Sequence, residues 1–200
     1  METRQYFSKN NTDLPSNEKL IFCKINDISF NFKTDNGVFS KDFLDFATKV
    51  LLEKMDYESI IDGTVLDVGC GYGPIGIYLA KIYQKEVVMV DVNPRALALC
   101  MDNVKLNNVN VEVMESDCLD GVLDRKFACV ITNPPIHAGK EVIYKIFTQT
   151  EEVLLPGGAL WIVMYEKHGA LSAIKKLKTI YPVVTTFYKK KGLYIIKCVK

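Results

Sequence analysis

Long apolar runs, Cys-x-x-Cys pairs and histidines are almost missing from this sequence. Its longest apolar stretches have the length of a strand, whereas a membrane-spanning helix needs about 20 apolar residues. The polar start at Met1–Arg4 lacks the apolar core of a signal peptide, so we expect a cytoplasmic protein without membrane contact. Only His137 and His168 are available beside the cysteines, and neither has ligand spacing, so we expect no metal site.

Disulfides and a strongly basic surface are also not expected. The six cysteines fall mostly in apolar patterns and come without a secretion signal, which is typical of reduced, buried thiols. A net charge of +1 argues against tight, non-specific binding of nucleic acid by the whole chain. Local basic patches stay open at Lys189–Lys191 and Lys175–Lys178, where an ordinary solvated surface is an equal alternative.

The size and the elements indicate one domain. A chain of 200 residues suits a single core, and we divide it into an N-terminal extension over 1–56 and a core over 57–200. In the extension we expect a β-hairpin of Leu20–Ile25 and Ile28–Phe32. Ser40 is a suitable N-cap for a following helix over Lys41–Met55, with Phe43 among its inward side chains.

The core alternates strands and helices. The expected strands are Val65–Val68, Glu86–Val90, Val109–Met114, Phe127–Thr132 and Ala159–Met164, followed by a pair over Val183–Tyr188 and Leu193–Val199. The expected helices are Pro74–Tyr83, Pro94–Leu106, Lys140–Leu154 and Gly169–Ile180. This order predicts an α/β, Rossmann-like fold, in which a seven-stranded, mostly parallel sheet ends on an antiparallel strand and carries helices on both faces. Ligands of such sheets bind beyond the carboxyl ends of the strands.

A glycine loop follows the first core strand. Gly71-x-Gly73-x-x-Gly76 matches the nucleotide-binding fingerprint, because glycines let the backbone turn tightly and approach a ligand before a helix N-terminus. A tight strand-to-helix turn without ligand is the alternative.

Acidic residues select the ligand. Asp91, 24 residues after Asp67, can accept two hydrogen bonds from ribose hydroxyls. Asp67 would repel a pyrophosphate but attract an ammonium group, which favours S-adenosylmethionine over NAD; capping of loop amides is the alternative. Asp117, after Ser116, can accept from an adenine amino group, or it can cap a turn.

Asn133-Pro134-Pro135-Ile136 follows the fourth core strand, on the same sheet edge as the glycine loop. The prolines stiffen the loop and hold Asn133 extended. The Asn133 side-chain oxygen and the Pro134 carbonyl can accept both hydrogens of a planar amino group, which directs the nitrogen lone pair at a methyl donor. A simple strand-ending turn is the alternative.

With Gly37-Val38-Phe39-Ser40 and His137-x-Gly139, these motifs resemble class I methyltransferases that act on amino or amide nitrogens, and more specifically the guanine methyltransferases of small-subunit ribosomal RNA. The resemblance runs from about Asn31 to the C-terminus and is similar to single-domain relatives. It implies catalytic roles for Asn133, Pro134 and Pro135, and substrate contacts for Ile136, His137 and Phe39. The residues expected to bind the cofactor are Asp67, Gly69, Cys70, Gly71, Gly73, Asp91, Val92, Ser116, Asp117 and Asn133.

The resemblance implies RNA methylation with S-adenosylmethionine as cofactor and ribosomal RNA or a subunit intermediate as partner. Ile136 departs from the family, where an aromatic residue often follows the prolines and stacks on a base. Three alternatives therefore stay open: methylation of a protein glutamine or a small molecule, a non-catalytic module for RNA assembly, and an NAD dehydrogenase. The sequence does not define the oligomeric state.

Overall fold

The computed structural model describes residues 14–200, so the polar start at Met1–Arg4 lies outside the described residues. Within that range, no helix has the length and apolar character needed to cross a membrane. The same residues contain no group of three or more His, Cys, Asp or Glu side chains that could hold a metal ion. All six cysteines are free thiols, of which Cys23 and Cys118 are half-buried and the others buried.

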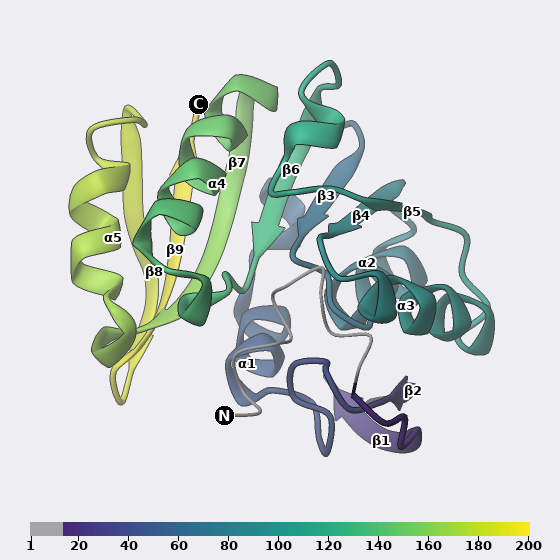
Figure 1. The fold of residues 1–200 in the computed structure, drawn as a ribbon. Coiled ribbons are helices and arrows are strands. Elements are labelled where there is room, and N and C mark those ends of the chain that lie inside the picture. Colours follow the sequence, from purple (N-terminus) through teal and green to yellow (C-terminus); the bar gives the residue numbers. More distant parts are fainter. Residues whose placement is uncertain (1–13) are drawn as a thin grey trace.

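A seven-stranded sheet forms the centre of the described molecule, in the order β5-β4-β3-β6-β7-β9-β8 (Figure 1). Its strands are β3 (Val65–Val68), β4 (Val87–Asp91), β5 (Glu112–Glu115), β6 (Phe127–Thr132), β7 (Leu154–Tyr165), β8 (Val183–Lys190) and β9 (Leu193–Val199). Strands β3 to β7 are mutually parallel, and β9 is antiparallel to both its neighbours. The predicted sheet is therefore confirmed. Its strand order switches direction at β3, where a ligand site is expected.

Helices cover both faces of the sheet, as predicted. They are α1 (Phe46–Lys54), α2 (Pro74–Tyr83), α3 (Pro94–Leu106), α4 (Lys140–Val153) and α5 (Ala170–Leu177), with short 3-10 turns η2 (Tyr57–Ser59), η3 (Asp120–Val122), η4 (Ile136–Ala138) and η5 (Glu166–His168). Side chains of α1, α2 and α3, such as Leu51 and Ile77, share one core with one side of the sheet. Those of α4 and α5, such as Phe147, form a second core with the other side.

The predicted hairpin is present as β1 (Lys19–Ile25) and β2 (Ile28–Thr34). Asn26 and Asp27 both have positive φ, which is the type I′ geometry that matches the twist of two antiparallel strands. Phe30 and Phe32 on its inner face pack against aromatic rings of the core domain. The hairpin is thus anchored to the domain beside α2 and α3.

The predicted start of the first helix is wrong. Helix α1 begins at Phe46, where the Asp45 carboxylate accepts a hydrogen bond of 2.8 Å from the Thr48 amide. Ser40 has a φ of 56°, a left-handed conformation unlike the extended one of an N-cap. Phe43, expected inside, is 70% exposed. The wrong helix start matters because it places Asp45 inside a helix, whereas Asp45 is the N-cap of α1.

Of the other boundaries, those of β5, α5, β7 and β8 differ most from expectation. β5 begins at Glu112 rather than Val109, and α5 ends at Leu177 rather than Ile180. β7 begins at Leu154, five residues before the predicted Ala159, because Leu154 already pairs with Phe127 across an irregular register. β8 continues to Lys190 instead of ending at Tyr188, because Lys189 and Lys190 pair with β9. The lysine run therefore belongs partly to a strand.

Candidate active site

A cavity of about 360 Å³ opens at the carboxyl ends of β3, β4 and β6. Ligand pockets for small molecules begin at about 300 Å³, so this volume suits a cofactor-sized ligand. The predicted site residues that line it are Phe39, Gly69, Cys70, Gly71, Asp91, Val92, Ser116, Asp117, Asn133, Pro134, Pro135, Ile136 and His137. Asp67 and Gly73 do not line the cavity.

The glycines of the loop have two different functions. Gly69 and Gly71 have positive φ, and a Cβ built on either meets nothing within 4 Å, so the bare backbone faces open space. At Gly73 such an atom would lie 2.8 Å from Cys100 Sγ. At Gly76 it would lie 2.1 Å from the Met89 sulfur. The first two glycines leave room for a ligand, whereas the last two allow α2 to pack closely on α3 and the sheet.

Asp91 ties the glycine loop to the next loop. Its Oδ2 accepts a hydrogen bond of 2.8 Å from the Gly71 amide, and its Oδ1 accepts one of 2.9 Å from the Asn93 amide. Burial raises the pKa of this carboxyl, and the amide hydrogen bonds oppose the shift. A carboxylate has about four acceptor sites, so Asp91 keeps acceptor capacity for a hydroxyl donor in the cavity that it lines.

Asp67 lies beneath the loop and is fully buried. Its Oδ2 accepts a hydrogen bond of 3.0 Å from the Gly76 amide in the first turn of α2, while its Oδ1 has no partner within the described residues. Burial raises the pKa of the Asp67 carboxyl to about 7. The hydrogen bond from the Gly76 amide is the amide-capping role that the sequence left open for Asp67. The second oxygen, Oδ1, has no partner within the described residues and can attract a cation.

The loop after β5 places Ser116 and Asp117 at the cavity wall. The Ser116 hydroxyl donates to the Cys118 carbonyl at 2.9 Å and accepts from the Gly121 amide at 3.0 Å, so it holds the loop in shape. The Asp117 carboxylate is exposed and forms an ion pair of 3.5 Å with Lys145. Of the two side chains, Asp117 is the one with acceptor capacity directed outward.

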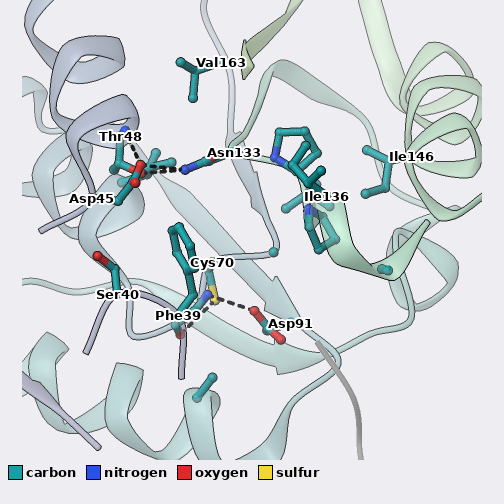
Figure 2. Close-up of a pocket in the computed structure, with 18 of the residues that line it drawn as sticks. Phe39, Ser40, Asp45, Thr48, Cys70, Asp91, Asn133, Ile136, Ile146 and Val163 are labelled. Atoms are coloured by element: carbon teal, nitrogen blue, oxygen red, sulfur yellow. Dashed lines mark hydrogen bonds between the residues drawn. The ribbon is translucent and has the colours of Figure 1, made fainter. Parts of the chain in front are cut away.

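Asn133 is held in one orientation by α1 (Figure 2). Its Nδ2 donates to Asp45 Oδ2 at 3.0 Å and to Thr48 Oγ1 at 2.9 Å. The reverse orientation would place the amide oxygen against a carboxylate oxygen, which is repulsive. Both amide protons are therefore used, and Oδ1 stays as the acceptor at the cavity wall.

The rest of the Asn-Pro-Pro-Ile loop forms a stiff, mostly apolar edge. Pro134 is buried, and Ile136 packs its side chain against the second core. His137 is exposed at the rim. Phe39 reaches the same cavity from the segment before α1 and is 43% exposed. An aromatic ring and an aliphatic side chain from separate segments therefore both line the cavity.

The lining residues that the sequence does not predict include Asp45, Thr48, Tyr165 and His168. Asp45 directly precedes the apolar run that begins at Phe46, which is an N-cap signal, and Ser40 is a competing candidate in the same segment. Tyr165 is the last residue of β7 and His168 the last of η5, and their rings lie edge to face with centroids 5.6 Å apart. Burial and then nearby Lys167 lower the pKa of His168.

The structure has a nucleotide-type glycine loop, an acidic residue at the end of the second core strand and an antiparallel last strand. Together these features define a class I methyltransferase fold. Residues 29–197 match the model of the methyltransferase small domain. The chain belongs to this family, which confirms the predicted resemblance.

The relatives are consistent with that assignment. The chain is 41% identical over 201 residues to the Bacillus subtilis protein YbxB, itself uncharacterized, with 99% of both chains covered. It is 39% identical over 132 residues to ribosomal RNA small subunit methyltransferase C of Pasteurella multocida, covering 64% of this chain and 39% of the relative.

Among solved structures, the Thermus thermophilus 16S ribosomal RNA N2 G1207 methyltransferase, in complex with AdoMet and guanosine, has a TM-score of 0.83 at 25% identity. That match covers 94% of this chain and 52% of the other. The chain therefore spans about half or less of the length of the named ribosomal RNA methyltransferases that it matches.

Proposed function

We propose that this protein transfers a methyl group from S-adenosylmethionine to the exocyclic amino nitrogen of a guanine in RNA, with small-subunit ribosomal RNA as the substrate. The observation that carries the proposal is the fixed Asn133 amide, whose oxygen is the acceptor at the cavity wall. The similarity to an N2 guanine methyltransferase that was solved with AdoMet and guanosine supports it.

The cofactor residues fit S-adenosylmethionine. When bound, the cofactor supplies a methyl group already activated on a sulfonium sulfur. Gly69 and Gly71 leave space for it, and Asp91 has lone pairs for its ribose hydroxyls. Asp117 is placed to accept from the adenine amino group, and the unpartnered oxygen of Asp67 attracts the ammonium group from beneath the loop.

The residues of the Asn-Pro-Pro-Ile loop bind and orient the acceptor. A guanine amino nitrogen is a weak nucleophile because its lone pair is delocalised into the ring. The Asn133 oxygen and the Pro134 carbonyl accept its two hydrogens and turn the lone pair toward the methyl donor. Such alignment lowers a barrier by at most about 7–11 kcal/mol. Phe39, Ile136 and His137 contact the faces and edge of the base.

Methylation of ribosomal RNA tests this function directly. Purified protein is incubated with radiolabelled S-adenosylmethionine and one of two substrates. The first is 16S ribosomal RNA transcribed in vitro, and the second is 30S subunits purified from cells that lack the protein. We expect label in the RNA, and nucleosides released from it should contain N2-methylguanosine. Label that runs with polypeptide and resists nuclease would indicate a protein acceptor. Protein that binds the cofactor but labels no RNA would argue against the proposal.

The buried Asp67 makes cofactor binding depend on pH. An ammonium group favours the ionised carboxylate, whereas the empty site favours the protonated one below pH 7, since the pKa of Asp67 is about 7. We expect the Kd for S-adenosylmethionine to rise as the pH falls from 7 to about 5.5, by at most about tenfold per pH unit. The α-amino group stays protonated over that range. Calorimetric titration measures the trend.

The matched control is Asp67→Asn, which keeps an oxygen for the Gly76 amide and removes the titration. This variant should bind more weakly at pH 7 and show a flat profile down to about pH 5.5. If the wild-type profile is also flat, the Asp67 carboxylate does not interact with the cofactor's charge.

A further inference from the structure

The turn between β8 and β9 lies at the end of the sheet where β7 also ends (Figure 1), and it carries three exposed lysines. Lys189 and Lys190 end β8, and Lys191 forms with Gly192 the two-residue turn into β9. Both turn residues have positive φ, the rigid type I′ geometry. A lysine in this conformation is uncommon and is not explained by turn formation, for which asparagine or glycine is better suited.

This turn is fastened to the wall of the cavity. Tyr165, which lines the cavity, pairs in the sheet with Leu193, the residue directly after the turn. The Glu166 amide donates a hydrogen bond of 2.7 Å to the Gly192 carbonyl. The lysines therefore lie two to four residues before Leu193, which pairs with Tyr165 at the cavity wall.

The positive charge of the turn is mostly not neutralised. Lys189 lies 4.0 Å from Glu166, which also accepts a hydrogen bond from the Tyr194 hydroxyl. Across residues 14–200, no carboxylate lies within ion-pair distance of Lys190 or Lys191. Lys167 adds another exposed charge next to Tyr165, with its Nζ 5.6 Å from the ring centroid.

We propose that the Lys189–Lys191 turn, with Lys167, binds backbone phosphates of the RNA that flanks the target nucleotide. The inference rests on the proposed function and adds the route by which the RNA reaches the cavity. A net charge of +1 argues against a generally basic surface, so attraction to phosphates must come from local clusters such as this one. When one RNA base lies in the cavity, the flanking RNA must run along the rim of the cavity. Its phosphates are attracted to lysines there whatever the base sequence.

The chain offers a matched control in its other lysine cluster. Lys175, Lys176 and Lys178 lie toward the end of α5, which leads away from the cavity edge (Figure 1). Changing either cluster to glutamine removes the same charge. The two triple variants are Lys189→Gln/Lys190→Gln/Lys191→Gln and Lys175→Gln/Lys176→Gln/Lys178→Gln. Each loses three charges and one lysine–aromatic contact, that of Lys189 with Tyr194 or of Lys176 with Tyr144.

Binding of a labelled 16S ribosomal RNA transcript is measured by fluorescence anisotropy over a salt series, and methyl transfer is followed in parallel. Each phosphate contact contributes about 0.7 to the slope of log affinity against log salt for single strands, so the turn variant should lose about 2. Its KM for RNA should rise about tenfold or more, with kcat and the Kd for S-adenosylmethionine unchanged. The α5 variant should match the wild type in all four quantities.

The outcomes separate this inference from the proposed function. If the wild type methylates RNA and the turn variant keeps the wild-type slope and KM, the lysine turn is not the RNA route. Equal losses in both triple variants would also overturn it. If the wild type binds RNA through the turn but transfers no methyl group, the proposed function fails and the turn stands. Wild-type protein that binds no RNA, or that binds an acidic protein through the turn instead, refutes the inference.

Discussion

Asn133→Ala should lower kcat for methyl transfer about 10²–10³-fold, the loss seen when one positioned hydrogen-bonding group is removed from a reacting centre. The Asn133 oxygen is preorganised, because its amide protons are already bound by Asp45 and Thr48. The variant removes that acceptor and leaves the glycine loop and Asp91 in place. Cofactor affinity should therefore change much less than kcat. Single-turnover methylation of RNA and calorimetric titration of S-adenosylmethionine measure the two effects.

The hydrogen bonds that hold Asn133 provide graded controls. Thr48→Val keeps the buried volume but removes one acceptor for the Asn133 amide, so kcat should fall about tenfold, in the range of a lost hydrogen bond to a buried group. Thr48→Ser restores the oxygen and should recover most of that loss. If Asn133→Ala retains wild-type kcat, or loses cofactor binding as strongly as turnover, the oxygen does not orient the acceptor.

Much of the cofactor side of the site could be predicted from sequence because the physics there is local. A buried strand, positive-φ glycines and a proline in the first turn of the next helix specify the loop between β3 and α2 almost without tertiary information. Parallel strands then bring their carboxyl ends to one edge. Asp91 and Asn133 both line the cavity there although 42 residues separate them in the sequence.

The acceptor side depends on contacts that no short pattern contains. Ser40 and Asp45 both precede the same apolar run, so the sequence does not decide which of them is the N-cap. Only the observed φ of Ser40 shows that Ser40 is not the N-cap. Asp45 then combines two tasks, since one carboxylate oxygen caps α1 and binds Asn133, 88 residues later. Tyr165 becomes part of the cavity through the length and register of β7. Neither the cap nor the register follows from hydrophobic periodicity alone.

Asp67 shows that the sequence does not define how deeply a side chain is buried. Its position before the glycines was clear from the sequence, but its depth was not. A residue at the end of a strand can face the cavity or lie beneath the loop, and packing of α2 on the sheet decides between them. The structure buries Asp67 fully against the α2 N-terminus. Any effect of Asp67 on a ligand is therefore an electrostatic attraction across the loop, because Asp67 does not itself line the cavity.

Loss of the carboxylate in Asp91→Ala is expected to weaken S-adenosylmethionine binding by about 10²-fold or more. Two hydrogen bonds to a charged group, worth about 1.5–3 kcal/mol each, would be lost with the ribose. The Gly71 and Asn93 amides would also lose their shared acceptor, so the glycine loop would no longer be held in its open form. Calorimetric titration at pH 7.5 gives the Kd, and thermal unfolding without cofactor reports the structural part of the loss.

A second aspartate on the same edge makes the comparison specific. Asp117→Ala removes an exposed carboxylate that is already paired with Lys145, and it would forfeit a single hydrogen bond to the adenine. Its effect on the Kd should stay near tenfold or below, with little change in thermal stability. Asp91→Ala that binds S-adenosylmethionine within about threefold of the wild type would mean that the ribose does not lie at the end of β4. Equal losses in both variants would mean that net charge at the cavity, rather than hydrogen bonding by Asp91, governs cofactor binding.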